Sequence, residues 1–126
     1  MSLLLRDNRV IVPSLRDGAP DIGALSDMVV TEGGIKFTNM IDVGTFTEII
    51  AFANVTEFTS GTVDIGFQIS PDGKNFLDVS DNFTQITAAG LSFKKITANF
   101  GKYIRLKITF ADPTDLTVSV WLACKG

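Results

Sequence analysis

The sequence contains no histidine and only one cysteine, Cys124, among its 126 residues. Without histidine, catalytic arrangements of the Ser-His-Asp and Cys-His kinds and histidine-based zinc sites are excluded. With a single cysteine the chain cannot form an internal disulfide, so nothing indicates an oxidising compartment. Because no basic cluster surrounds Cys124 to activate its thiol, we predict that it is a buried structural residue at the end of a strand.

Charge is scarce and long apolar runs are missing. Charged residues make up 20% of the chain and the net charge is −3, which disfavours a nucleic-acid partner. No window approaches the ~18 apolar residues of a membrane span. The run Leu3, Leu4 and Leu5 meets Arg6 and Asp7 too soon for a signal peptide. We expect a globular protein that is synthesised in the cytoplasm and has no membrane partner.

Carboxylates are the main remaining candidates for chemistry, and 14 are present. A paired-carboxylate glycosidase is not excluded by residue type. However, Asp64 and Asp72 fall where polar strand faces or turns are expected, with no apolar surroundings to raise a pKa. The segment DVSDN, residues 78–82, offers oxygen ligands for a cation but lacks EF-hand spacing, so we favour a turn. The sequence predicts no catalytic residue, no metal site and no cofactor.

Residues from Ser26 onward form short segments rich in Val, Ile, Thr and Phe, separated by Gly, Pro, Asn and Asp. This pattern predicts an all-β fold, an antiparallel β-sandwich of jelly-roll type. Residues 1–25 have two of the four prolines and no sustained period, so we predict an extended N-terminal arm before a domain of residues 26–126. The predicted strands lie near residues 27–31, 34–38, 45–55, 61–69, 75–79, 83–87, 91–97, 102–110 and 116–123.

Three segments alternate between apolar and polar residues with the two-residue period of a half-buried strand. The segment EIIAFANV, residues 48–55, is apolar on both faces. It predicts a central strand whose second face meets the N-terminal arm or another subunit. The residues predicted to face the core from the three alternating segments are Val63, Ile65, Phe67 and Ile69; Ile104, Leu106, Ile108 and Phe110; and Leu116, Val118, Val120 and Leu122.

Two further segments have the composition of hairpin turns. ADPTD, residues 111–115, predicts a short turn between the last two strands. A hairpin there would place Arg105 near Trp121 on an outward face that also carries Tyr103. EGGIKF, residues 32–37, likewise predicts a hairpin turn, because no helix follows it to make a phosphate-binding loop.

The turn SPDGKN, residues 70–75, has residues suited to a bulged hairpin, with Gly73 at a position of positive φ. A bend therefore explains its composition without a ligand. The combination of SPDGKNF with the later GKYIRLKI, residues 101–108, resembles discoidin-type domains. That resemblance implies a carbohydrate- or surface-binding module that uses Trp121, Tyr103 and Arg105, or the end of the fold that carries the SPDGKN turn.

The order of segments over residues 58–123 is similar to that of small β-sandwich virion proteins of tailed bacteriophages. The segments are a Gly-Thr-Val strand, FQISPDGKNFLDV, a Thr-rich strand, AAGLSFKKI, GKYIRLKITF and the closing LTVSVWLAC strand. This second resemblance implies a non-enzymatic structural protein that decorates or stabilises the capsid, or belongs to the neck or tail. It implies localisation in the virion, homo-oligomers with trimers favoured, and other virion proteins as partners.

Apolar residues of the predicted arm and an outward aromatic group are the predicted interface. The arm residues need a surface on which to dock, either on their own domain or on a neighbouring subunit. Trp and Arg are common at interface hot spots, although an Arg that only covers an exposed indole explains Arg105 and Trp121 equally well. The predicted interface residues are Leu3, Leu4, Leu5, Val10, Ile11, Val12, Tyr103, Arg105 and Trp121.

Overall fold

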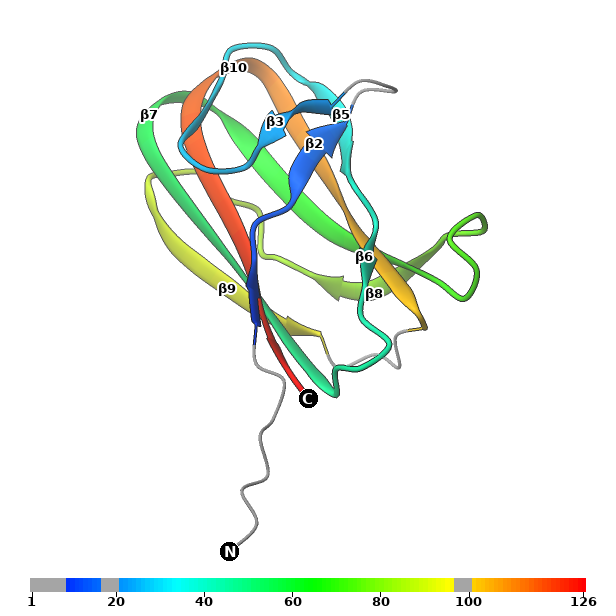
Figure 1. Ribbon diagram of the computed structural model, residues 1–126. Helices are drawn as coiled ribbons and strands as arrows, with labels where there is room; N and C mark the ends of the chain where they lie inside the picture. Colours follow the sequence, from blue (N-terminus) through cyan, green and yellow to red (C-terminus); the bar gives the residue numbers. More distant parts are fainter. Residues whose placement is uncertain (1–8, 17–20, 97–100) are drawn as a thin grey trace, which may run out of the picture.

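The computed structural model describes residues 9–16, 21–96 and 101–126 (Figure 1). The described residues form strands and no helix, and all paired strands are antiparallel, which confirms the predicted all-β, antiparallel class. The strands are β1 (Arg9–Ile11), β2 (Ser14–Arg16), β3 (Asp21–Ala24), β4 (Met28–Val30), β5 (Gly34–Thr38), β6 (Ile41–Asp42), β7 (Glu48–Ser70), β8 (Leu77–Asn82), β9 (Gly90–Ile96) and β10 (Tyr103–Lys125).

Two strands of 23 residues each, β7 and β10, organise the sheet. They pair from Tyr103 opposite Ser70 to Lys125 opposite Glu48. Each contains two of the predicted strands, which the structure joins into one. Both arch over at the top of Figure 1, so each long strand contributes to two halves of a bent sheet.

The bend contains the predicted ADPTD turn, and the prediction of a hairpin there is wrong. The segments on either side of residues 111–115 pair with β7 and not with each other. Residues 112–114 bulge out opposite Gly61, where the register shifts, and Thr114 Oγ1 donates a hydrogen bond to Ala111 O at 2.7 Å. The turn composition therefore bends a continuous strand, because β7 offers hydrogen-bonding partners on both sides of the bulge.

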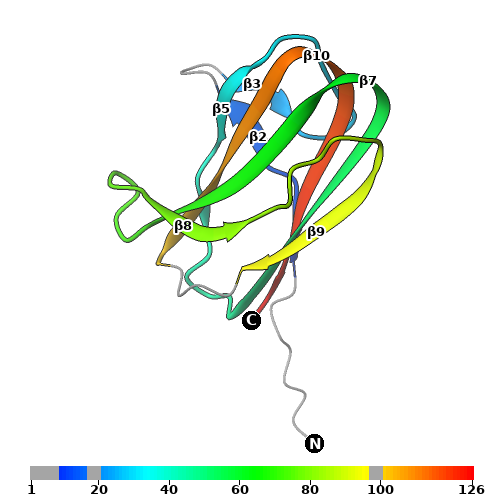
Figure 2. The same cartoon turned by 180° about the vertical axis from the view of Figure 1, so that it is seen from behind.

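Neighbouring strands follow the same bend. β4 pairs with residues 116–118 of β10 and β5 with residues 107–110, so EGGIKF is not the predicted hairpin either. The Asp112 carboxylate accepts a hydrogen bond from the Gly33 backbone N–H at 2.7 Å, which ties this connection to the bulge. Along the edge of β7 that faces away from β10, β9 pairs with the first half of β7 and β8 pairs with the second half (Figure 2).

One apolar cluster draws on both halves of the sheet. The inward residues predicted from alternation are confirmed as buried, apart from Ile69, which is partly buried against the cluster. The central position of EIIAFANV is also confirmed, since β7 lies between β9 and β10. Phe67, one of the largest fully buried side chains, packs near Phe83 with ring centroids 6.0 Å apart.

The described part of residues 1–25 lies in this same sheet. β1 pairs with the end of β10, and β2 pairs with both β3 and β5. Leu15 and Leu25 are buried in the core, and Ile11 packs against it. These residues therefore dock on their own domain. Leu3, Leu4 and Leu5 lie outside the described residues.

Cys124 is buried in β10, as predicted, and burial raises the pKa of its thiol to about 11. Since the thiolate is the reactive form, we expect the native protein at pH 8 to react with a thiol reagent at least about tenfold more slowly than the denatured chain. A reagent that releases a chromophore when it reacts with a thiol allows the reaction rates of the native and the denatured chain to be followed by absorbance. Equal rates would show that the strand end opens readily and would contradict the observed burial.

Candidate interaction surfaces

The outward face of the sheet half near the C-terminus is apolar. Phe52 on β7 lies directly between Phe93 on β9 and Trp121 on β10 in the strand register. Phe93 is 69% exposed and Leu91 is 64% exposed, whereas Phe52 and Trp121 are partly buried. We call this surface the aromatic face and define it by the residues Val10, Ile50, Phe52, Leu91, Phe93 and Trp121.

The rings in this row cover one another. The Phe52 and Trp121 ring centroids are 5.7 Å apart with planes inclined by 16°, and the Phe52 and Phe93 centroids are 6.2 Å apart at 39°. Rings lying flat side by side would collide at 5.7 Å, so Phe52 and Trp121 are offset and stacked. Their facing surfaces are closed to a sugar ring, and the row presents ring edges together with the exposed Phe93.

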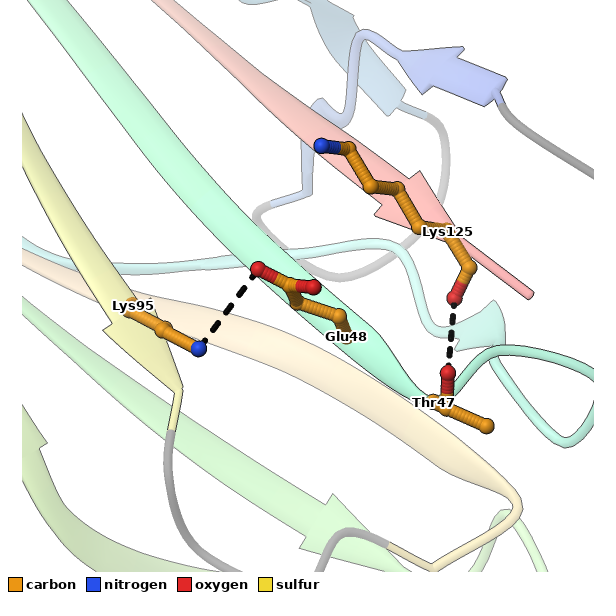
Figure 3. A network of polar contacts seen from close by, with 4 residues as sticks. All are labelled: Thr47, Glu48, Lys95 and Lys125. Carbon is orange, nitrogen blue, oxygen red and sulfur yellow. Dashed lines mark hydrogen bonds and ion pairs between the residues drawn. The ribbon is translucent and has the colours of Figure 1, made fainter.

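Polar contacts border the aromatic face at the end nearest the C-terminus. Lys95 Nζ on β9 lies 3.5 Å from Glu48 Oε1 on β7, and the Thr47 hydroxyl donates a 3.4 Å hydrogen bond to the Lys125 carbonyl (Figure 3). The Lys95 and Glu48 side chains are 55% and 37% exposed. An ion pair this accessible contributes little stability, so its main effect is to set the charge at this border.

Arg105 occupies a different surface, on the other half of the sheet. Its guanidinium carbon lies 4.5 Å from the Phe37 ring centroid and 3.9 Å from that of Phe76. Arg105 Nε donates a 2.7 Å hydrogen bond to Gln68 Oε1, and Gln68 Nε2 donates one of 2.9 Å to Asp78 Oδ1. Burial lowers the pKa of Arg105, while the charge of Asp78 opposes that shift. Arg105 thus joins β5 to the loop before β8.

Replacing Arg105 tests this structural role. We expect Arg105→Ala to lower the free energy of unfolding by about 1–3 kcal/mol, from two cation–π contacts and one hydrogen bond. Arg105→Lys should lose most of the same amount, because an ammonium group cannot lie flat between two rings. Urea denaturation measures both. Lys107→Ala, on the same face of β10, is the control and should change stability by less than about 0.5 kcal/mol.

The structure separates the residues predicted as one outward group. Trp121 stacks on Phe52, and Arg105 contacts Phe37 and Phe76, so the predicted proximity of Arg105 and Trp121 is wrong. The physical reason is the continuous β10, in which 15 residues and the bend lie between Arg105 and Trp121. Tyr103 lies beside Lys102, whose Nζ is 5.4 Å from the ring centroid. Of the predicted arm residues, Val10 and Val12 are exposed.

Sequence reasoning missed Phe52, Leu91 and Phe93 as surface residues. A usable signal was present in LSFKKI, residues 91–96, where Leu91 and Phe93 alternate with Ser92 and Lys94. In the structure Ser92 and Lys94 lie opposite Ala53 and Ala51 on the inward side of β9. The apolar residues of that strand therefore face outward.

The SPDGKN turn forms a closed network of its own groups. Asp72 Oδ1 accepts hydrogen bonds from the backbone N–H groups of Lys74 and Asn75 at 2.8 and 2.9 Å. The Asn75 backbone and then Lys74 hold the pKa of Asp72 well below its usual value. Ser70 Oγ accepts a hydrogen bond from the Gly73 N–H at 2.9 Å, and Gly73 has the predicted positive φ, +77°. The polar groups of the turn thus bind one another, which explains its composition as that of a bend between β7 and β8.

A polar cavity of about 440 Å³ lies beside β8 on the second half of the sheet. Asp64 accepts a 3.1 Å hydrogen bond from Gln85 Nε2 next to this cavity. Acidic, amide, amino and hydroxyl side chains line it, including Asp64, Asp78, Asn82, Lys107 and Thr109.

Across residues 9–16, 21–96 and 101–126, no group of three His, Cys, Asp or Glu side chains is placed to hold a metal ion. The described part of the chain also has no helix of the length and apolarity needed to cross a membrane.

No protein-family model matches the chain, and a search of curated proteins finds no match.

Proposed function

We propose that this chain is a non-enzymatic structural protein of a tailed-phage virion. In this proposal it decorates or stabilises the capsid, acting through homo-oligomerisation and binding to other virion subunits rather than through chemistry. We also propose that the bent sheet is a jelly-roll-like β-sandwich with an N-terminal arm.

The aromatic face is the observation that carries this proposal. Phe93, Leu91 and Val10 are each more than 60% exposed on one sheet face. Exposed apolar patches of this kind are typical of protein interfaces. The order of sequence segments over residues 58–123 resembles that of small virion proteins, and in a virion such a face would be covered by a neighbouring subunit.

Immunogold electron microscopy tests the proposal. Antibodies raised against the purified chain are applied to tailed-phage particles from cultures that express it. We expect regular labelling of the heads, and recovery of the chain from the same particles by mass spectrometry after washing in high salt. Particles that carry neither label nor chain would overturn the proposal. Labelling confined to the neck or tail would move the protein to that part of the virion.

The polar cavity favours a second candidate, a carbohydrate-binding module. Asp64, Asn82 and Thr109 offer the hydrogen-bonding groups that sugar hydroxyls use, although the aromatic row lies on the other half of the sheet. A glycan array with the intact chain and with Asp64→Ala tests this function. Binding that the Asp64 variant loses would support the module, and an array with no bound glycan would count against it.

A further inference from the structure

Charged residues of opposite sign border the two ends of the aromatic face along its strands. Near the C-terminal end it is bordered by Lys95 and Lys125, with Glu48 paired to Lys95. Toward the bend it is bordered by acidic residues, including Asp27, whose backbone N–H donates a 2.8 Å hydrogen bond to Ser119 Oγ. Asp115, which pairs with Ser60, is exposed at the same end of the strands. The two ends of the face therefore carry opposite net charge.

We propose that the aromatic face binds the same face of a second copy of this chain, with the strands of the two copies running in opposite directions about a two-fold axis. An axis that lies in the interface and runs across the strands places the acidic end of each copy over the basic end of the other. The central aromatic row then meets its counterpart. The inference rests on the proposed function in taking self-association as the mode of action.

Pairing through strand edges fits the structure less well than packing through faces. β9 pairs only with β7 among the described residues, so its other edge is open. However, Lys94 lies on the inward side of this edge strand, opposite Ala51. An inward lysine on an edge strand opposes strand addition, because its charge would be buried between the joined sheets. The exposed rings of the face carry no such penalty.

The proposed pairing also differs from the trimer that the virion resemblance implies. A two-fold axis joins identical patches and closes at two copies, whereas a trimer joins two different patches around a three-fold axis. The opposite charges at the ends of one apolar face make that face complementary to itself. The arrangement of charge therefore favours a dimer.

Sedimentation velocity of the full chain over a concentration series tests the pairing. We expect a dimer, and we expect Phe93→Ser to raise its dissociation constant at least about 30-fold, as for a central aromatic hot spot. Leu77→Ser is the matched control, because Leu77 is 66% exposed on β8, in the other half. It should change the constant less than about twofold. A monomer, a trimer, or a Phe93 variant that dimerises like the parent would overturn the inference.

Zero-length carbodiimide cross-linking of mixed ¹⁵N-labelled and unlabelled chains tests the orientation. The opposed orientation of the two copies predicts links between copies that join Lys95 or Lys125 to Asp27 or Asp115. Links between copies that join Lys95 only to Glu48, or no such links, would overturn it. Head labelling by a trimeric chain would overturn this inference and leave the proposed function standing, and a dimer absent from virions would do the reverse.

Discussion

Replacing Phe67 by alanine is expected to lower the free energy of unfolding by about 3–5 kcal/mol. Phe67 is among the largest fully buried side chains and lies in the core beside Phe83. The substitution removes a ring and leaves a cavity that two continuous strands cannot readily close. In guanidinium denaturation we expect a lower midpoint, while the slope of the free energy of unfolding against denaturant concentration stays unchanged.

The control for Phe67 is Leu77→Ala, which shortens an exposed apolar side chain on β8. It should change the free energy of unfolding by no more than about 0.5 kcal/mol. If both variants lost the same amount, the apolar cluster around Phe67 would not be the main source of stability. A loss near 1 kcal/mol at Phe67 would indicate that the sheet closes over the missing ring.

Replacing Gly61 by alanine is expected to lower the free energy of unfolding by about 2–4 kcal/mol. Gly61 has a φ of +106°, which side chains adopt only with strain. An added Cβ would also lie 3.1 Å from Pro113 O and Thr114 Cα, in the backbone of the β10 bulge. The two long strands would then have to separate at the bend.

Gly90→Ala separates the two causes. Gly90 has a φ of +145°, but a Cβ there meets no other atom within 4 Å. Its replacement should therefore cost only the conformational strain, about 1–2 kcal/mol. The difference between the two variants in urea denaturation measures the close approach at the bend. Equal losses would mean that the bulge yields without cost and would contradict the tight contact.

The sequence predicted the parts of the fold that depend on local periodicity. Alternation identified the inward faces of β10 and of the second half of β7, and turn composition identified the positive φ of Gly73. ADPTD was misread because its composition is the same whether the chain reverses or bends. The choice depends on the partner strand, and β7 bends at the same level. Such a long-range pairing leaves no signal within residues 111–115.

The candidate surface was only half predicted, for a related reason. Trp121 was expected to face outward, but its neighbours Phe52 and Phe93 come from strands 28 to 69 residues earlier in the chain. Likewise, Phe37 and Phe76 meet at Arg105 only after β5 and the loop before β8 are placed on either side of it. Side chains that converge through sheet pairing cannot be grouped from one sequence until the strand order is known.

The passage of β7 and β10 through both halves of the sheet has a consequence for the way the molecule opens. Neither half has a central strand of its own, so one half cannot detach while the other keeps its hydrogen bonds. Amide hydrogen exchange in the central segments 49–55 and 63–69 should then proceed by the same global opening, with equal protection in both. Partial unfolding should be confined to peripheral strands, and the protein should lose its structure in one cooperative step.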